Sequence, residues 1–197
     1  GSNIFLNTIN NKFIKKTFFD KKILFKNTDY KFKSFEDYYL NVRETLEKSL
    51  QLRLRADVKI AFCLSGGVDS SGLVSIAKKK FNMNTKCYSI IDKDKRYNEE
   101  KNIKTLEENL KLNLKRIYIK GEEEFFENLN DLIKYHDSPI STISYYAHSK
   151  ISKAASEDGY KVILSGTGAD EIFSGYYDHY LFHLNKLNRV NKDLFIK

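Results

Sequence analysis

Hydrophobic residues in this 197-residue chain occur in two patterns, short apolar runs and longer stretches with helical spacing. The apolar runs are rich in β-branched and aromatic side chains and predict buried strands at 58–64, 85–91, 115–120 and 160–164. Apolar residues recur every three or four positions between these runs, which predicts helices near 73–81, 98–112, 121–136 and 144–157. Because the two patterns alternate, we expect an α/β fold with a twisted parallel sheet and helices on both of its faces.

The first 34 residues show no sustained period, and we interpret them as a linker or hairpin tail with short strands at 23–25 and 30–32. A helix is predicted to begin at Ser34, whose hydroxyl can cap it, with Asp37 as the partner in a capping box. Apolar residues then follow at helical spacing: Phe35, Tyr39, Val42, Leu46 and Leu50. We therefore expect two parts, a tail over 1–34 and a folded domain over 35–197.

The clearest candidate for chemistry is the sequence SGGVDSS at 65–71, which we call the first glycine loop. It follows a predicted strand and precedes a predicted helix. Gly66 and Gly67 lack a Cβ, so the backbone can approach an anion closely, and the helix N-terminus adds free N–H donors. Hydroxyl donors come from Ser65, Ser70 and Ser71. The loop therefore predicts a phosphate site, and an ordinary strand-to-helix turn with a serine cap is the alternative.

Asp69 stands out in this loop because a carboxylate repels a phosphate. Mg²⁺ between the two groups removes the conflict, since magnesium favours one or two carboxylates together with phosphate oxygens. The loop is not a Walker-type P-loop, because the lysine of that motif is absent. We therefore expect a magnesium ion beside the phosphate.

A second glycine loop, residues 165–176 with the sequence SGTGADEIFSGY, follows the last predicted strand. Gly166 and Gly168 again permit close approach of the backbone. Ligands bind at the carboxyl ends of parallel strands, so we expect Asp170 and Glu171 to lie at the same sheet edge as Asp69. The alternative is that these two acids serve only as first-turn helix residues.

Both loops resemble motifs of the asparagine synthetase family. Residues 65–71 are similar to the pyrophosphate loop S-G-G-[LV]-D-S-[SA] of ATP pyrophosphatases, and residues 165–176 are similar to S-G-[ET]-G-x-D-E-x-F-x-G-Y of the asparagine synthetases. Residues 52–57 and 137–146 resemble further family segments, and the similarity runs over about 35–177. The resemblance implies an adenine nucleotide alpha hydrolase-like, Rossmann-like fold.

The resemblance also implies roles for individual residues. Asp69 and Asp170 would bind Mg²⁺ and act in catalysis. The residues that would bind ATP are Leu64, Ser65, Gly66, Gly67, Asp69, Ser70, Ser71, Ile90, Ser165 and Gly166. The implied reaction is attack of a carboxylate on the α-phosphorus of ATP, which gives an acyl adenylate and pyrophosphate, after which ammonia displaces AMP to form an amide.

The chain departs from the family pattern at Thr167, where many members carry Glu, and a threonine cannot act as a carboxylate base. The family's glutaminase domain, which supplies ammonia from glutamine, has no counterpart in the sequence, and neither has a later segment with a catalytic lysine. Gly1 and Ser2 resemble a cloning remnant. We therefore interpret the chain as a fragment, with 1–34 as a linker from a missing N-terminal domain and 35–197 as a synthetase domain incomplete at its C-terminal end.

Composition and net charge limit the classes of partner that we expect the protein to bind. The net charge of +8 invites a nucleic-acid interpretation, but the lysines are dispersed and form no dense basic block, so we expect none. No apolar run is long enough to span a bilayer. Cys63 and Cys87 both fall in predicted strands, which disfavours a disulfide and favours the cytoplasm. The expected substrate is a small carboxylate, and a homodimer is compatible with this interpretation.

Several alternatives stay open. The acceptor is either aspartate or another carboxylate, such as a uronic acid sugar of a surface polysaccharide, for example lipopolysaccharide. The enzyme could instead be a tRNA-thiolating relative, although no C-x-x-C is present, or a nucleotide-binding scaffold with decayed catalysis. The histidines are expected in surface or polar-packing positions rather than at a metal: His136, His148, His179 and His183. Helix packing or a border of the acceptor pocket would each suit the aromatic stretch 176–180.

Overall fold

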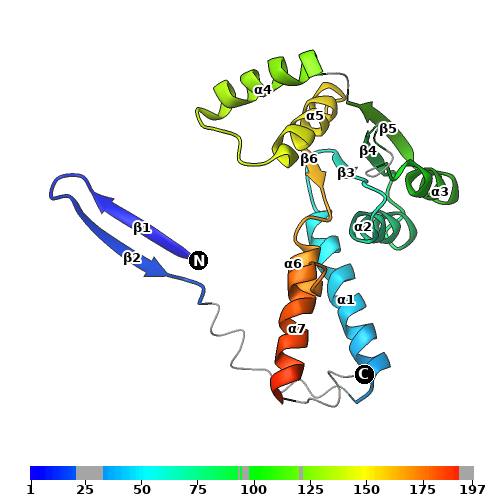
Figure 1. Ribbon diagram of the computed structural model, residues 1–197, viewed down its shortest axis with the longest axis horizontal. Coiled ribbons are helices and arrows are strands. Elements are labelled where there is room, and N and C mark those ends of the chain that lie inside the picture. Colours follow the sequence, from blue (N-terminus) through cyan, green and yellow to red (C-terminus); the bar gives the residue numbers. More distant parts are fainter. Residues whose placement is uncertain (21–32, 93, 95–97, 120–121, 191–197) are drawn as a thin grey trace. The chain divides into compact units, whose positions relative to one another are not determined.

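The computed structural model describes residues 1–20, 33–92, 94, 98–119 and 122–190 (Figure 1). The chain divides into two compact units, residues 1–46 and 47–197. The strands expected at 23–25 and 30–32 lie outside the described residues.

The first unit contains an antiparallel hairpin of β1 (Ser2–Asn7) and β2 (Lys12–Thr17), together with most of α1 (Phe35–Arg53). The start of α1 is as predicted. The Asp37 backbone nitrogen donates to Ser34 Oγ at 3.0 Å, and Asp37 Oδ2 accepts from the Lys33 backbone nitrogen at 3.2 Å. The Ser34 hydroxyl thereby satisfies one N–H of the first helical turn. The Asp37 carboxylate bonds to Lys33, one residue before the predicted capping-box partner Ser34.

The second unit is built on a four-stranded parallel sheet with strand order β5-β4-β3-β6. Its strands are β3 (Ile60–Cys63), β4 (Lys86–Ile91), β5 (Asn113–Tyr118) and β6 (Val162–Leu164). All four predicted strands are therefore confirmed. β3 is shorter than predicted because pairing with β6 begins only at Ile60, opposite Val162, after the exposed Val58 and Lys59.

The helices follow the predicted alternation. They are α2 (Val68–Lys79), α3 (Glu100–Leu110), α4 (Glu122–His136), α5 (Ile143–Glu157), α6 (Ala169–Phe173) and α7 (Tyr177–Val190). α4 ends before the turn at Asp137, where the chain's single proline, Pro139, follows. No helix in the described part of the chain is both long and apolar enough to cross a membrane.

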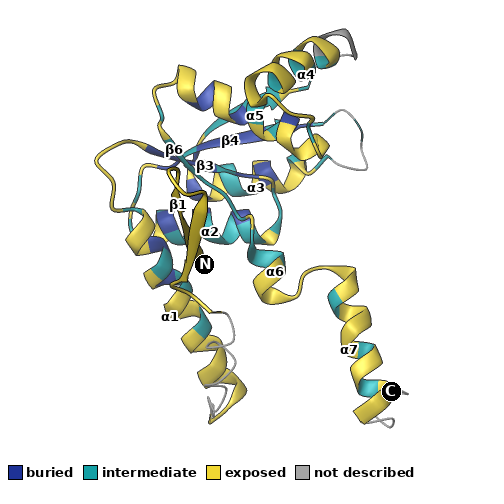
Figure 2. Ribbon diagram, turned by 90° about the vertical axis from the view of Figure 1, so that its left-hand side faces the viewer, coloured by how far each residue is buried: buried dark blue, intermediate teal, exposed yellow. Residues whose placement is uncertain are grey.

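The strand side chains alternate between two cores, one on each face of the sheet. Figure 2 shows buried residues, in dark blue, along β4 and in part of α5. Phe62 and Leu64 pack with residues of α1, α2 and α3 on one face. Ala61 and Tyr88 pack with residues of α5 on the other. This alternation is the period of two expected for a strand buried on both sides. The prediction of a parallel α/β sheet with helices on both faces is confirmed.

The strand order creates a switch point between β3 and β6. The chain moves from β3 to β4 and β5 on one side, and β6 then adds to the other side of β3 (Figure 1). Phe62 pairs with Leu164, so the loops that leave β3 and β6 start next to each other. Ligands of open α/β sheets bind at such a point, outside the carboxyl ends of the strands.

Candidate functional site

The first glycine loop is held in shape by the hydroxyl of Ser70, which is buried. Ser70 Oγ accepts from the backbone nitrogen of Ser65 at 3.1 Å and donates to the carbonyl oxygen of Gly67 at 3.2 Å. Ser65 Oγ lies 2.9 Å from the same hydroxyl and accepts from the Gly67 backbone nitrogen at 3.2 Å. The two serines therefore close the loop on itself and fix its backbone.

The helix that follows this loop starts without a side-chain cap. α2 begins at Val68, after Gly67, and among the described residues this N-cap position makes no side-chain cap hydrogen bond. Uncapped N–H groups at a helix start carry a partial positive charge and are donors for an anion. The hydroxyl oxygen of Ser71 in that turn is buried and has no hydrogen-bond partner among the described residues. The loop thus presents unused donors at the place where the sequence predicts a phosphate.

Glycine is required at position 66 for two reasons. Its φ is +89°, a region that L side chains rarely adopt, and a Cβ built there would lie 3.0 Å from Glu99 Cβ and 3.1 Å from Ile103 Cγ1. The loop therefore packs directly on the start of α3. Glu99 Oε2 would lie 3.1 Å from the same built atom, so its carboxylate faces the loop.

The second glycine loop packs onto the first. A Cβ built on Gly166 would lie 2.8 Å from the Ser70 backbone nitrogen and 2.9 Å from Asp69 Cβ. Gly168 follows with φ +98°, and α6 begins at Ala169. A Cβ on Gly175 would collide with the carboxyl group of Asp170. Three glycines thus allow the second loop to bring Asp170 toward the first.

A cavity of about 690 Å³ opens where the two loops meet. Its lining comes from both loops, the ends of β3 and β4, the start of α3 and one side of α5: Cys63, Leu64, Ser65, Gly67, Val68, Asp69, Tyr88, Ile90, Glu99, Ala147, His148, Ile151 and Asp170. The volume is within the range of pockets that bind nucleotides and other small ligands. Asp69 and Asp170 are both on its wall, as the sheet topology predicted.

The remaining predicted site residues lie around the cavity rather than on its wall. Gly66, Ser70 and Gly166 form the packed layer of the two loops. Ser71 is the residue with the unpartnered hydroxyl. Ser165 Oγ donates to Thr167 Oγ1 at 2.9 Å, within the second loop.

The carboxylates in the cavity suit a magnesium ion that shares its ligands with a phosphate. Within the described part of the chain, no three acidic, histidine or cysteine side chains converge closely enough to hold a metal by themselves. Magnesium bound with a nucleotide needs only one or two carboxylates, because phosphate oxygens and water supply the other ligands. Asp69 and Asp170 therefore fit Mg²⁺ with a phosphate ligand, and they do not form a metal centre of their own.

Comparison with known proteins settles the family. The asparagine synthase family model matches residues 41–193. The chain belongs to the asparagine synthase family. The chain is 31% identical over 136 residues to asparagine synthetase 1 (glutamine-hydrolyzing) of Bacillus subtilis, covering 68% of this chain and 21% of that protein.

Two further similarities are to a curated relative and to a solved structure. The chain is 30% identical over 137 residues to a Methanocaldococcus jannaschii protein named as glutamine-hydrolyzing asparagine synthetase 2, covering 70% of this chain and 26% of that protein. It therefore spans about a quarter or less of the length of these relatives. The NH3-dependent NAD synthetase of Campylobacter jejuni, solved with a nitrate ion, has a TM-score of 0.49 and 18% identity, covering 70% of this chain and 60% of that one.

The position at which this asparagine synthase domain departs from the family motif lies away from the cavity wall. Thr167 is exposed, is bonded to Ser165 and is not among the lining residues. Glu171 is also engaged locally, because the Tyr176 hydroxyl donates to its Oε1 at 2.8 Å. That bond lowers the pKa of Glu171 and raises the pKa of Tyr176. Neither residue lines the cavity.

Several wall residues of this cavity are not among the site residues predicted from the sequence. Glu99 follows the loop after Ile90, a loop that was expected at the site without a named acid. Ala147 and Ile151 were predicted to face inward on α5, and that same spacing signals that His148 lies next to them. The sequence predicts His148 at the surface or in polar packing. It is exposed, but the structure places it on the cavity wall.

The floor of the cavity is anchored by Tyr88. Its hydroxyl donates to Asp158 Oδ2 at 2.7 Å, and Asp158 Oδ1 lies 2.9 Å from Lys115 Nζ. Burial, followed by the bond to Asp158, raises the pKa of Tyr88, so the phenol stays protonated. Burial raises the pKa of the neighbouring Cys63 thiol to about 11. The Tyr88 phenol and the Cys63 thiol both line the cavity and remain uncharged at neutral pH.

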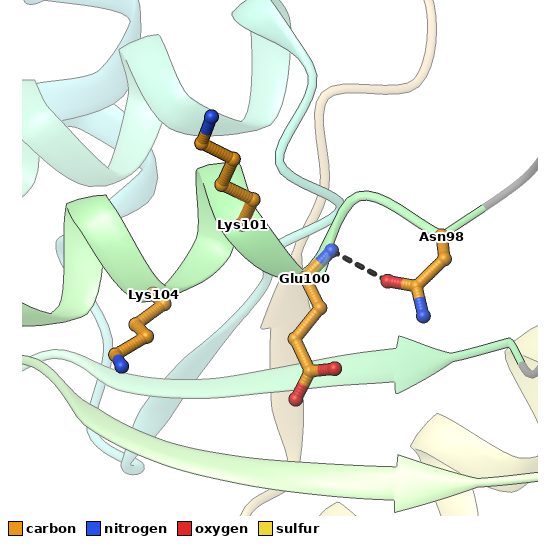
Figure 3. A pocket seen from close by; sticks show the side chains of 4 residues that line it. All are labelled: Asn98, Glu100, Lys101 and Lys104. Carbon is orange, nitrogen blue, oxygen red and sulfur yellow. Dashed lines mark hydrogen bonds between the residues drawn. The ribbon is translucent and has the colours of Figure 1, made fainter. Parts of the chain in front are cut away.

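A separate hollow of about 550 Å³ lies at the start of α3 and shares none of its described lining residues with the cavity between the two glycine loops (Figure 3). Asn98, Glu100, Lys101 and Lys104 line it. Asn98 Oδ1 accepts from the Glu100 backbone nitrogen at 2.8 Å and so caps the helix. Asn98 and the Glu100 backbone therefore have a structural role at the start of α3.

Proposed function

We propose that this domain binds Mg-ATP in the cavity between the two glycine loops and activates a carboxylate as its adenylate. Pyrophosphate leaves, and ammonia then displaces AMP to form an amide. The observation that carries the proposal is that Asp69 and Asp170, from two loops far apart in the sequence, line one cavity next to an uncapped helix start. Membership of the asparagine synthase family supports the same chemistry.

The pyrophosphate portion of ATP would lie on the first glycine loop. The α2 N–H groups and the unpartnered Ser71 hydroxyl would donate to its oxygens, while Ser65 and Ser70 hold the loop in shape. Leu64 and Ile90 would contact the nucleoside, since they are the apolar wall residues nearest to the strand ends. Ser165 and Gly166 would support it from the second loop. With the nucleoside at Leu64 and Ile90 and the pyrophosphate on the first glycine loop, the α-phosphate would lie between these two groups of residues.

Asp69 and Asp170 would hold the magnesium ion. The ion supplies neutralisation of the charge on the pyrophosphate leaving group. The two carboxylates would fix the position of the phosphate chain, because Asp69 sits on a loop that the serine hydrogen bonds close and Gly166 of the second loop packs against Asp69. Such alignment of phosphate and acceptor accounts for much of the barrier lowering in reactions of this class.

The acceptor would be aspartate or another carboxylate, such as a uronic acid sugar of a surface polysaccharide. Thr167 and the exposed Tyr176 and Tyr177 distinguish this chain from a typical aspartate site, which favours the sugar. We propose that ammonia comes from glutamine through a glutaminase domain and that the reaction takes place in the cytoplasm. Both relatives described above are named as glutamine-hydrolyzing.

A nucleotide-binding scaffold without catalysis is the second candidate, and Thr167 is the observation that favours it. The two carboxylates on the cavity wall favour the enzyme, because a scaffold needs no metal-bound leaving group. A tRNA-thiolating activity has less support. Cys63 and Cys87 are free thiols within β3 and β4, and neither lies in a loop.

Calorimetric titration with Mg-ATP tests the proposal directly. We expect binding that depends on magnesium and that weakens at least tenfold in Asp69→Asn, while the exposed Asp178→Asn serves as the matched control and leaves it unchanged. Absence of Mg-ATP binding by the unsubstituted chain would contradict the proposal. Pyrophosphate release with ammonia and a panel of aspartate, uronic acids and sugar nucleotides then separates enzyme from scaffold and identifies the acceptor.

A further inference from the structure

One histidine reaches the cavity from the face of the sheet opposite to the first glycine loop. α5 packs its Ile151, Ala154 and Ala155 against the core around Tyr88. His148 lies nearly one turn before Ile151 and lines the cavity together with Ala147 and Ile151. α2 belongs to the core on the other face. The cavity therefore lies between the start of α2 and the side of α5, and His148 faces it from α5.

The charges on the cavity wall make this histidine unusual. The lining contains three carboxylates, Asp69, Glu99 and Asp170. Among the described residues of the lining, His148 is the side chain that can carry a positive charge, and its ring makes no hydrogen bond with any other described residue. A nucleotide brings several further negative charges into this space. The ring nitrogen of His148 is therefore a hydrogen-bond donor that can contact the phosphates of a bound nucleotide.

We propose that His148 donates a hydrogen bond to the α-phosphate of the bound nucleotide. This inference rests on the proposed function, because it takes ATP as the ligand. In the proposed binding mode, Leu64 and Ile90 contact the nucleoside and the start of α2 contacts the pyrophosphate. The α-phosphate joins these two ends, and His148 reaches the cavity from the side that the first glycine loop does not cover. His148 is thus a binding residue at the phosphorus that the acceptor attacks.

A ligand series separates contact with the α-phosphate from contact with the nucleoside. Dissociation constants are measured for adenosine, AMP and Mg-ATP on the unsubstituted chain, on His148→Leu and on His148→Gln. Leucine keeps similar bulk without a donor, whereas glutamine restores an N–H donor. We expect His148→Leu to weaken AMP and Mg-ATP about tenfold, the loss typical of a hydrogen bond to a charged group. Adenosine binding should not change, and His148→Gln should recover most of the loss.

His183→Leu is the matched control, since this histidine is exposed on α7 and does not line the cavity. His148 is itself exposed, so its replacement should leave the melting temperature unchanged. Equal weakening of adenosine and AMP would overturn the proposal in favour of a nucleoside contact, and unchanged constants for all three ligands would overturn it entirely. Failure of the unsubstituted chain to bind Mg-ATP would overturn the proposed function as well, and so the two failures are distinguishable.

Discussion

Gly166 lies so close to Ser70 that a Cβ built on it would come within 2.8 Å of the Ser70 backbone nitrogen. The contact follows from the strand pairing, because the Phe62 and Leu164 register starts both loops side by side. We predict that Gly166→Ala pushes the second loop away from α2 and separates Asp170 from Asp69. The expected cost is about 1–3 kcal/mol of folding stability, as for other overpacked sites. Mg-ATP affinity measured by calorimetry should fall more than tenfold.

Gly72 provides the control for this substitution. It lies within α2, and a Cβ built there meets no atom within 4 Å. Gly72→Ala should therefore raise the free energy of unfolding by about 0.5–1 kcal/mol, since alanine is the better helix residue. Its Mg-ATP affinity should not change. Equal effects of the two alanine substitutions would show that the contact between the loops does not matter for binding.

We predict that Ser71→Ala stabilises the ligand-free protein but weakens its binding of Mg-ATP. Its hydroxyl oxygen is buried without a hydrogen-bond partner in the described structure, and such a group costs about 1–3 kcal/mol. Ser71→Ala should raise the melting temperature of the ligand-free protein by about 2–12 °C. If the hydroxyl donates to a phosphate in the complex, the same change should weaken Mg-ATP binding about tenfold. Thermal unfolding with and without Mg-ATP measures both effects.

Ser75 in the same helix separates this effect from helix propensity. Its side chain makes no hydrogen bond with other described residues, so Ser75→Ala reports only the preference of a helix for alanine. The rise in melting temperature should be clearly larger for Ser71→Ala than for Ser75→Ala. A lower melting temperature in Ser71→Ala would mean that this hydroxyl stabilises the free loop.

The sequence predicted the frame of the site because its signals are local. Strand runs, helical spacing and glycine turns depend on neighbouring residues, so the four strands of the sheet and the loop at 65–71 could be recognised directly. The meeting of Asp69 and Asp170 also followed, since parallel strands bring their carboxyl ends to one edge. Metal binding by these two residues stays a prediction.

What the sequence did not reveal depends on packing between distant elements. Glu99 faces the first glycine loop only because Gly66 packs on the start of α3. His148 lines the cavity because Ile151 and Ala154, on the same helix, fix α5 against the sheet. A helical pattern shows which residues share a face, but it does not show that this face extends from the core to a cavity. These two residues could therefore be assigned only from the fold.

The thiol of Cys63 should be unreactive although it lines the cavity. Desolvation by burial raises its pKa from 9.0 to about 11, which lowers the thiolate fraction at neutral pH by about a hundredfold. The Cys87 thiol, with a pKa of about 12, should react more slowly still. Labelling with a small maleimide at pH 7.5 should therefore be slow in the folded protein and fast for both thiols in urea. Rapid labelling of Cys63 in the folded protein would contradict its burial.

Asp158 should make folding stability depend on pH in the acid range. The bond from Lys115, followed by that from Tyr88, lowers the Asp158 pKa below its ordinary value of 3.8. The folded protein therefore favours the charged carboxylate more than the unfolded chain does. The resulting stabilisation is fully present above pH 3.8 and is lost as the pH falls through the lower pKa of the folded state. We expect Asp158→Asn to melt below the unsubstituted protein at pH 7, with the difference narrowing below pH 3.8.

Melting curves of Asp158→Asn and of the unsubstituted protein, recorded between pH 7 and pH 3, test this prediction, with Asp131→Asn as the control. Asp131 lies 3.8 Å from Lys134, and both side chains are 79% exposed, so this ion pair contributes little to stability. Its substitution should not alter the melting temperature at any pH in the series. A difference between Asp158→Asn and the unsubstituted protein that stayed constant down to pH 3 would show that Asp158 acts through its shape rather than its charge. The anchoring of Tyr88 in the cavity floor would then depend on the hydrogen bond alone.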